Sequence, residues 1–232
     1  MIYGVTIGEN HSIDDWGLIL TRRIISPPEV QTNFIEVPQR DGKIDLTESL
    51  AGLVKYYNRE IELDFTFKDE IGEYSARFSE IQNYCHGKKM RIIFDDDFDN
   101  YYLGRIIVES NEVNEKLGQI VIKAECEPYK YDLQSTDEMW LWDPFDFEEG
   151  TINEFIDVPV NGIETITLIA KRQVTYPTIS VNSHMTVEFD GVQYGLEKGE
   201  NKMYDILLPE GENNLIFRGN GTVTIRYRGG SL

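Results

Sequence analysis

Apolar and polar residues alternate strictly over residues 60–67, which read Glu60-Ile61-Glu62-Leu63-Asp64-Phe65-Thr66-Phe67. Successive side chains of a β-strand point to opposite faces of its sheet, so this period of two predicts a strand with one buried face. Residues 117–126 repeat the pattern, and one face is formed by Ile120, Ile122, Ala124 and Cys126. Because this period of two dominates the chain, the predicted fold class is mainly β. The apolar face of each strand needs a covering layer.

One segment breaks this period and predicts a helix. Its apolar residues fall three and four positions apart, which places them along one helix face: Ile71, Tyr74, Phe78, Ile81 and Cys85. Asp69 is suited to cap the N-terminus, and Gly87 suits the C-terminal end. Glu73 and Arg77 form an i,i+4 pair. We predict a single helix over about residues 70–86, packed against a sheet.

An acidic turn separates two predicted strands, residues 90–94 and 101–108, which together form a hairpin. Its carboxylates are Asp95, Asp96, Asp97 and Asp99. Clustered carboxylates can bind calcium, but this spacing lacks the alternating ligands, the glycine and the distal glutamate of an EF-hand loop. We therefore interpret these carboxylates as solvated and assign no metal site.

The character of the chain changes after Tyr129. Residues 132–150 mix acidic residues with Trp140, Trp142, Phe145 and Phe147 and show no clean periodicity, which indicates a connector whose aromatics dock on a neighbouring surface. We expect an N-terminal domain over residues 1–131, the connector over 132–150 and a C-terminal β-sandwich over 151–232.

The last part of the chain has short strands with turn signals about every 8–12 residues, which favours a sandwich. Asp190-Gly191 between two apolar runs predicts a tight hairpin. Further strands are expected at residues 204–208, 215–217 and 223–227, with a turn at Gly219-Asn220-Gly221 between the last two.

Composition limits what the protein can bind. The chain has 41 acidic and 22 basic residues, a formal charge of −19, and a surface this acidic repels nucleic acid and anionic lipid. No apolar run approaches the roughly 20 residues of a membrane span, so we expect no membrane insertion. Cys85 and Cys126 are too few for a disulfide framework or a zinc site, and we expect buried thiols.

No motif of catalytic chemistry stands out, and we predict no catalytic, cofactor or metal site. His11, His86 and His184 lie far apart, outside any nucleophile or metal-ligand motif. A glycoside hydrolase would need two carboxylates at a defined separation, and 41 acids always offer such a pair, so that signal has little specificity. A carbohydrate-binding accessory module that recognises the host cell wall is a stronger alternative, because sugars stack on exposed aromatics such as Tyr176, Tyr194, Tyr204 and Tyr227.

Four regions carry a family resemblance. In residues 16–52 a tryptophan-led strand crosses Pro27-Pro28 and reaches the turn Val37-Pro38-Gln39-Arg40-Asp41-Gly42. The second region is the acidic turn with the residues that follow it, Tyr101-Tyr102-Leu103-Gly104-Arg105. The third is Ala124-Glu125-Cys126-Glu127-Pro128-Tyr129. The fourth combines Tyr176-Pro177-Thr178-Ile179 with the end of the chain at residues 219–228. Together they resemble the distal tail protein family of siphophages over nearly the whole chain. The sequence departs from that pattern at Gln39 and Lys43, where glycine and an acid are expected.

The resemblance implies a tail-tube-like β-sandwich or split barrel with one helix, followed by a galectin-like, carbohydrate-binding-module-like β-sandwich. It implies a non-enzymatic protein, made in the bacterial cytoplasm, that forms a homohexameric ring at the distal end of the tail in the virion. Expected partners are further copies of the chain, the tail tube protein, the tape-measure protein, a tail-associated tip protein and a receptor-binding protein. Genomic DNA would pass through the ring without specific binding.

We expect an arm or hairpin at about residues 24–46 that adds strand edges to a neighbouring subunit, because a closed ring needs head-to-tail contacts. The candidate interface residues are Trp16, Pro27, Pro28, Phe34, Arg40, Asp41 and Tyr101. Six chains of charge −19 carry −114 in total, so we also expect carboxylates to line a negative channel.

Overall fold

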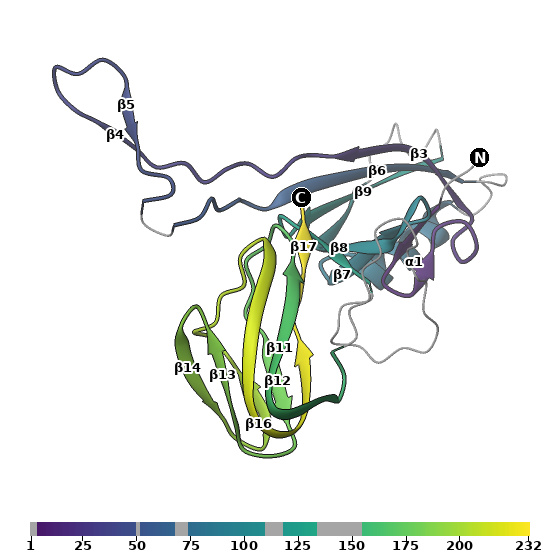
Figure 1. Cartoon of the computed structure of the whole chain (residues 1–232). Coiled ribbons are helices and arrows are strands. Elements are labelled where there is room, and N and C mark those ends of the chain that lie inside the picture. The colour runs from purple at the N-terminus through teal and green to yellow at the C-terminus, as the bar shows by residue number, and fades with distance from the viewer. Residues whose placement is uncertain (1–3, 50–51, 68–73, 110–117, 134–154) are drawn as a thin grey trace. The chain divides into compact units, whose positions relative to one another are not determined.

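The computed structural model describes residues 4–49, 52–67, 74–109, 118–133 and 155–232 (Figure 1). The chain divides into two compact units, residues 1–130 and 131–231, with Leu232 grouped with the first. Strands dominate both units, and the described residues contain one helix. The predicted fold class, mainly β with one helix, is confirmed.

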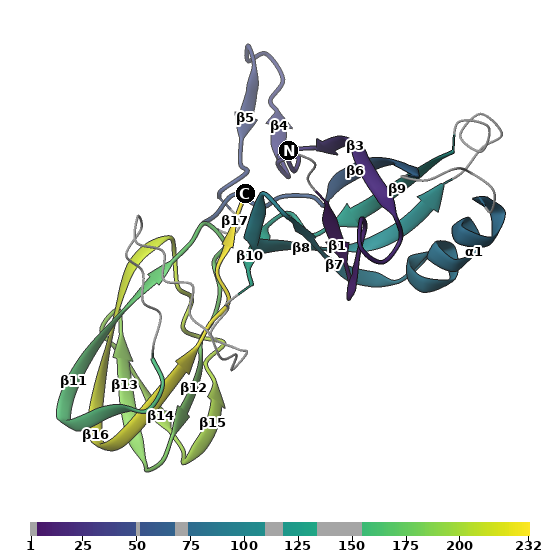
Figure 2. The same cartoon turned by 90° about the vertical axis from the view of Figure 1, so that its right-hand side faces the viewer.

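The first unit contains an antiparallel sheet in which neighbouring strands follow the order β2-β1-β7-β8-β9-β6-β3. The bounds of its elements in chain order are β1 Val5–Ile7, β2 Asn10–His11, β3 Leu18–Ile25, β6 Arg59–Phe67, α1 Tyr74–Cys85, β7 Lys89–Phe94, β8 Asp97–Glu109 and β9 Gln119–Cys126. Between β3 and β6 the chain leaves this sheet and forms a separate hairpin of β4 (Phe34–Glu36) and β5 (Lys43–Asp45), as Figures 1 and 2 show.

The apolar residues of the period-two pattern form the core of this unit. Along β6 the side chains of Ile61, Leu63 and Phe65 are fully buried, while the residues between them are partly exposed. The predicted face of β9 is buried as well: Ile120, Ile122, Ala124 and Cys126. Since β6 pairs with β9 on one side and β3 on the other, these faces form one continuous apolar layer.

The helix begins at Tyr74 and ends at Cys85, so its described part is shorter than the predicted span of about residues 70–86. It buries Tyr74, Ile81 and Cys85, as the predicted stripe requires. Its expected cap and the first residue of the stripe, together with Glu73, lie outside the described residues.

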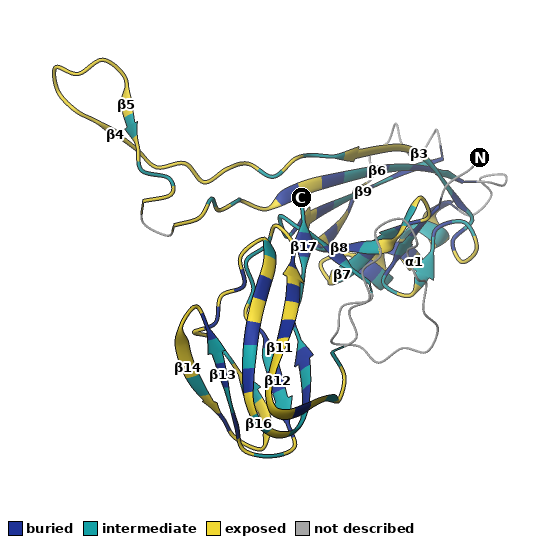
Figure 3. Cartoon of the chain, in the orientation of Figure 1, coloured by how far each residue is buried: buried dark blue, intermediate teal, exposed yellow. Residues whose placement is uncertain are grey.

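The second unit has a six-stranded sheet in the order β14-β13-β16-β12-β15, with β11 paired to β16. Its elements are β10 Lys130–Asp132, β11 Val158–Ala170, β12 Thr178–Val181, β13 Met185–Phe189, β14 Val192–Leu196, β15 Gly199–Lys202, β16 Gly211–Arg226 and β17 Gly230–Ser231. Figure 3 shows the alternation of buried and exposed residues along β11 and β16. The expected connector falls mostly on residues 134–154, which lie outside the described residues.

The predicted hairpin at Asp190-Gly191 is confirmed. Phe189 pairs with Val192 across a two-residue turn, in which Asp190 has a φ of 49° and Gly191 a φ of 77°. Two positive φ angles are typical of the turn whose twist matches that of the flanking strands.

Two other expectations for this unit are wrong. Residues 215–217 and 223–226 belong to one strand, β16, which continues through the predicted turn. Glycine is required at residue 219 (φ 146°) because the backbone of β16 lies close to Met185 on β13. A Cβ at this position would lie 2.9 Å from Met185 Cγ. Residues 204–208 form no strand: the segment turns, with Ile206 N donating to Met203 O, and only Leu208 bridges to Thr175.

Both cysteines are buried, as expected. The Cys85 thiol donates to Ile81 O at 3.1 Å on the helix, and Cys126 is packed on β9. Burial disfavours the charged thiolate, and it raises the pKa of Cys85 to about 11 and that of Cys126 to about 12.

We therefore expect neither thiol of the folded protein to react with a water-soluble thiol reagent at about pH 8, because the thiolate is the reactive form. The measurement is colorimetric thiol titration of the folded chain. The control is the same sample in denaturant, which should release two thiols per chain. Rapid reaction of one thiol before unfolding would contradict the burial.

Candidate assembly surface

The arm comprises residues 26–58 and continues the ladder between β3 and β6. At its base Ser26 N donates to Glu60 O at 3.0 Å. Further out the two sides pair again, through an antiparallel bridge of Val30 with Tyr56 and a bond from Tyr57 N to Glu29 O at 2.8 Å. The arm is therefore a hydrogen-bonded ribbon that projects from the edge of the sheet (Figure 1).

The arm exposes apolar side chains on both faces. Residues 29–43 are all exposed, and Phe34 is 48%, Ile35 46% and Val37 39% exposed (Figure 3). Consecutive strand residues point to opposite faces, so Phe34 and Ile35 lie on opposite sides of the hairpin. A two-stranded hairpin is only marginally stable in water by itself. Contiguous exposed apolar surface is typical of interaction sites, which makes the arm the candidate surface.

The tip of the arm is a structured turn. Arg40 N donates to Val37 O at 3.2 Å, and Lys43 forms an ion pair with Glu36 at 2.9 Å across the hairpin. Gln39 has a φ of 64°, in the left-handed region that favours glycine. The turn thus keeps the backbone expected of a glycine at this position although the residue is a glutamine.

The predicted interface residues separate into two groups. Pro27, Pro28, Phe34, Arg40 and Asp41 lie on the arm, where all are exposed except Pro28, which is half-buried. Trp16 (6% exposed) and Tyr101 (2%) are core residues of the first unit. Trp16 packs edge-on against Tyr84 at 5.7 Å, and the Arg91 guanidinium lies over the Tyr101 ring at 5.0 Å. The candidate surface is therefore the arm.

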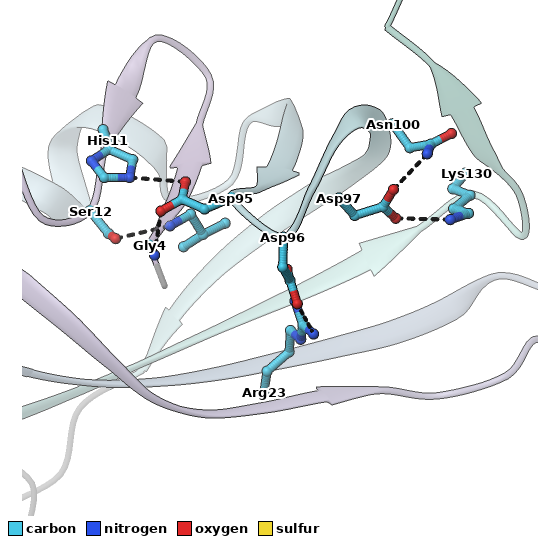
Figure 4. Close-up of polar contacts among 10 residues, drawn as sticks. Gly4, His11, Ser12, Arg23, Asp95, Asp96, Asp97, Asn100 and Lys130 are labelled. Atoms are coloured by element: carbon cyan, nitrogen blue, oxygen red, sulfur yellow. Dashed lines mark hydrogen bonds and ion pairs between the residues drawn. The ribbon is translucent and has the colours of Figure 1, made fainter. Parts of the chain in front are cut away.

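The acidic turn, in contrast, links strands within the first unit (Figure 4). Asp95 accepts from Gly4 N at 2.6 Å and lies 3.2 Å from His11 Nε2, which ties the turn to the segments around β1 and β2. Asp97 accepts from Asn100 and from Lys130 at 2.8 Å. The interpretation of the carboxylates as merely solvated is wrong for Asp95 and Asp97, because each bonds to a residue distant in sequence.

Asp96 makes the strongest of these contacts. Arg23 on β3 donates to both of its oxygens, at 2.6 and 2.8 Å, and the same guanidinium lies 4.6 Å from the centre of the Phe94 ring. The hydrogen bonds from Arg23 lower the pKa of Asp96. No local sequence signal could reveal this pair, because 73 positions separate the two residues. Among the described residues, no cluster of three or more His, Cys, Asp or Glu is placed to hold a metal ion.

Two of the four tyrosines considered for sugar stacking are exposed in the second unit. Tyr176 is 44% and Tyr204 60% exposed, and their ring centroids are 4.7 Å apart. Tyr227 is buried, and its hydroxyl donates to Ile169 O. Tyr194 packs against the core. Of these four tyrosines, Tyr176 and Tyr204 are therefore the candidates for stacking against a sugar.

Replacing Asp96 by Asn should lower the free energy of unfolding at neutral pH by about 0.5–1 kcal/mol, the range of partly exposed ion pairs. The folded-state pKa is lowered, so this stabilisation is present above the unfolded pKa and is lost as pH falls through the folded one. Chemical denaturation should show the stability difference between the variant and the original chain shrinking as the pH falls below the ordinary carboxyl pKa of Asp, about 3.9. Asp41→Asn, an exposed change on the arm, is the control and should change little at either pH. A difference that persisted in acid would contradict the role of the ion pair.

Comparison with known proteins places this fold in a family. A family model described as phage tail protein RIFT-related domain matches residues 11–126, half of the 232-residue chain. No curated protein sequence matches the chain. The crystal structure of the SPP1 Dit (gp 19.1) protein, described as a paradigm of the hub adsorption apparatus in phages that infect Gram-positive bacteria, is similar over 100% of both chains, with a TM-score of 0.62 and 14% identity. No described helix is long and apolar enough to cross a membrane. The chain therefore belongs to the phage tail protein family that this RIFT-related domain defines, and it has the fold of a distal tail protein.

Proposed function

We propose that this phage tail protein forms a closed ring of six copies at the distal end of the tail, where it joins the tail tube to the baseplate or tip. The observation that carries the proposal is the arm, whose apolar side chains at Phe34, Ile35 and Val37 are left in solvent in the single chain. The family and the fold support the same role. Further partners of the ring are the tail tube, tape-measure, tail-associated tip and receptor-binding proteins.

The ring contact is head-to-tail, with the arm of one copy adding strand edges to the next. Such heterologous contacts close into a ring when their rotation divides a full turn. The sheet of the first unit offers a suitable edge, because β3 pairs only with β6 among the described strands, whereas the opposite edge strand, β2, has two residues. Backbone groups along an open edge are the usual acceptors of an added strand.

The acidity of the chain suits a channel for DNA. Six copies at −19 carry a charge of −114, and carboxylates lining the channel would repel the phosphate backbone as genomic DNA passes. The protein acts as a structural component of the virion, without enzymatic activity.

We expect the double variant Phe34→Asp/Ile35→Asp to remain folded and to lose the hexamer, because it places a charge on each face of the arm hairpin. Deletion of residues 27–45 should have the same effect. Native mass spectrometry measures the assembly, and circular dichroism checks the fold. The matched control is Phe98→Asp, which changes a phenylalanine that is also exposed (60%, against 48% for Phe34) but lies away from the arm, and it should leave the ring intact.

If the arm-deleted chain still formed stable hexamers, the proposal that the arm makes the ring contact would be wrong. Imaging of the same rings also examines the channel, since a neutral or basic lumen would refute the proposed passage of DNA along carboxylates.

A second candidate function is recognition of host cell-wall carbohydrate, which the exposed pair of Tyr176 and Tyr204 favours. The loops that carry the pair are tied together, since Met203 N donates to Pro177 O at 3.0 Å and Leu208 N to Thr175 O at 2.8 Å. Rigid, exposed aromatic rings offer apolar contact area at low cost in conformational entropy, and the apolar face of a sugar ring stacks on such a surface.

If this function holds, the full chain should bind purified cell-wall polysaccharide of a host strain, and Tyr204→Ala should weaken that binding several-fold. Tyr57→Ala is the control, because Tyr57 is as exposed (57%) but lies on the arm. Equal binding by both variants, or no binding by the original chain, would exclude the tyrosine pair as a sugar site.

A further inference from the structure

The second unit has a long strand with an open edge. β11 spans 13 residues, Val158–Ala170, and pairs only with β16 among the described strands. In Figure 2 it lies at the margin of the unit with β16 beside it. Backbone N–H and C=O groups on the side away from β16 therefore form a row available to another strand.

Beyond Pro159 and the bend at Gly162, this edge lacks the usual protection against pairing. Natural edge strands carry charged residues, proline or bulges that prevent edge-to-edge association. Residues 163–170 contain no proline and a single charge, Glu164, and they are rich in β-branched residues. Two isoleucines on the outward face, Ile163 and Ile169, are 59% and 49% exposed. A segment of this composition is a strong template for strand pairing.

The sequence of the edge is nearly palindromic. Residues 163–169 read Ile-Glu-Thr-Ile-Thr-Leu-Ile, so the order of side chains is the same in both directions except at Glu164 and Leu168. The preceding Gly162 has a φ of 84°, which bends the strand and limits the straight segment at this end. The strand ends at Ala170, so the centre of the palindrome, Ile166, also lies near the centre of the straight segment.

We propose that β11 pairs antiparallel with β11 of a second copy of this chain, around a two-fold axis at Ile166. In this register Ile163 lies opposite Ile169 of the second copy, and Thr165 opposite its Thr167. Opposed β-branched pairs of these types stabilise antiparallel strands. A two-fold contact uses the same surface on both copies and so requires a self-complementary strand, which the palindrome supplies.

The charges are compatible with this register. Glu164 lies opposite Leu168 of the second copy, so the two glutamates do not face each other. Each chain nevertheless carries a charge of −19, and repulsion between the copies opposes association. Salt screens exposed charges over about 10 Å at 0.1 M, so the contact becomes stronger as salt is raised.

The contact is independent of the proposed ring. Neighbours in a head-to-tail ring use two different surfaces, whereas the β11 contact uses one surface twice. It therefore joins free chains before assembly or one ring to another, and it survives when the arm contact is lost.

The test is disulfide cross-linking between two chains that each carry one new cysteine. A Thr165→Cys chain and a Thr167→Cys chain are oxidised separately and as a mixture, at high salt. In the proposed register the new thiols face each other only in the mixed dimer. In either chain alone they are diagonal neighbours about 7–8 Å apart, beyond the reach of a disulfide. The buried Cys85 and Cys126 do not interfere.

We expect covalent dimer in the mixture and several-fold less in either chain alone, with the same result in the Phe34→Asp/Ile35→Asp background. In the Phe34→Asp/Ile35→Asp background, where the ring is lost, Thr165→Lys should abolish the dimer seen by sedimentation equilibrium, whose mass is twice 26.8 kDa. The control Val192→Lys adds the same charge to another edge strand, β14, and should preserve it. Absence of cross-linking in the mixture, or equal cross-linking in all three samples, would overturn the proposal.

Discussion

The ladder between β3 and β6 determines where the arm leaves the first unit and in which direction it projects. β6 lies between β3 and β9 and buries Ile61, Leu63 and Phe65 on one face. A slip of one residue in its register would move all three into solvent, so the register is strongly specified. The bond from Ser26 to Glu60 continues the same ladder into the arm. A hairpin that would be marginal in isolation is thereby held at its base by the core of the unit.

The acidic turn stabilises this arrangement from the side of β7 and β8. Asp96 holds Arg23 on β3, while Asp95 holds the backbone of Gly4. Each contact joins the turn to a segment outside the β7–β8 hairpin: Arg23 lies on β3, and Gly4 directly precedes β1. In a chain of charge −19, the pairing of Asp96 with Arg23 and of Asp97 with Lys130 also offsets part of the local repulsion.

Local periodicity predicted those elements whose structure depends on neighbours in sequence. The strands β6 and β9, the helix stripe and the β13–β14 hairpin all follow from spacings within about ten residues. The acidic turn could not be interpreted this way, because the partner of Asp96 is 73 positions away. Gly219 and Gly221 show a related ambiguity: glycine signals a turn or a close approach equally well, and here Met185 on β13 decides.

The candidate surface was predictable only in part, for the same physical reason. The prolines, the extended run and the Arg-Asp-Gly turn indicated an arm, and Phe34, Arg40 and Asp41 do lie on it in exposed positions. Trp16 and Tyr101 were grouped with them by motif, yet both are core residues. Whether an aromatic side chain faces a core or a partner depends on the tertiary packing around it, and a motif in one sequence carries no information about that packing.

The two open edges of the chain differ in symmetry, and this difference separates their roles. The arm is unlike the sheet edge that it would join, so its contacts repeat from copy to copy until a ring closes. The β11 edge is nearly palindromic about Ile166, so a contact there satisfies both copies at once and offers no edge for a third. Growth by the arm is therefore limited by ring closure, and association through β11 is limited to pairs.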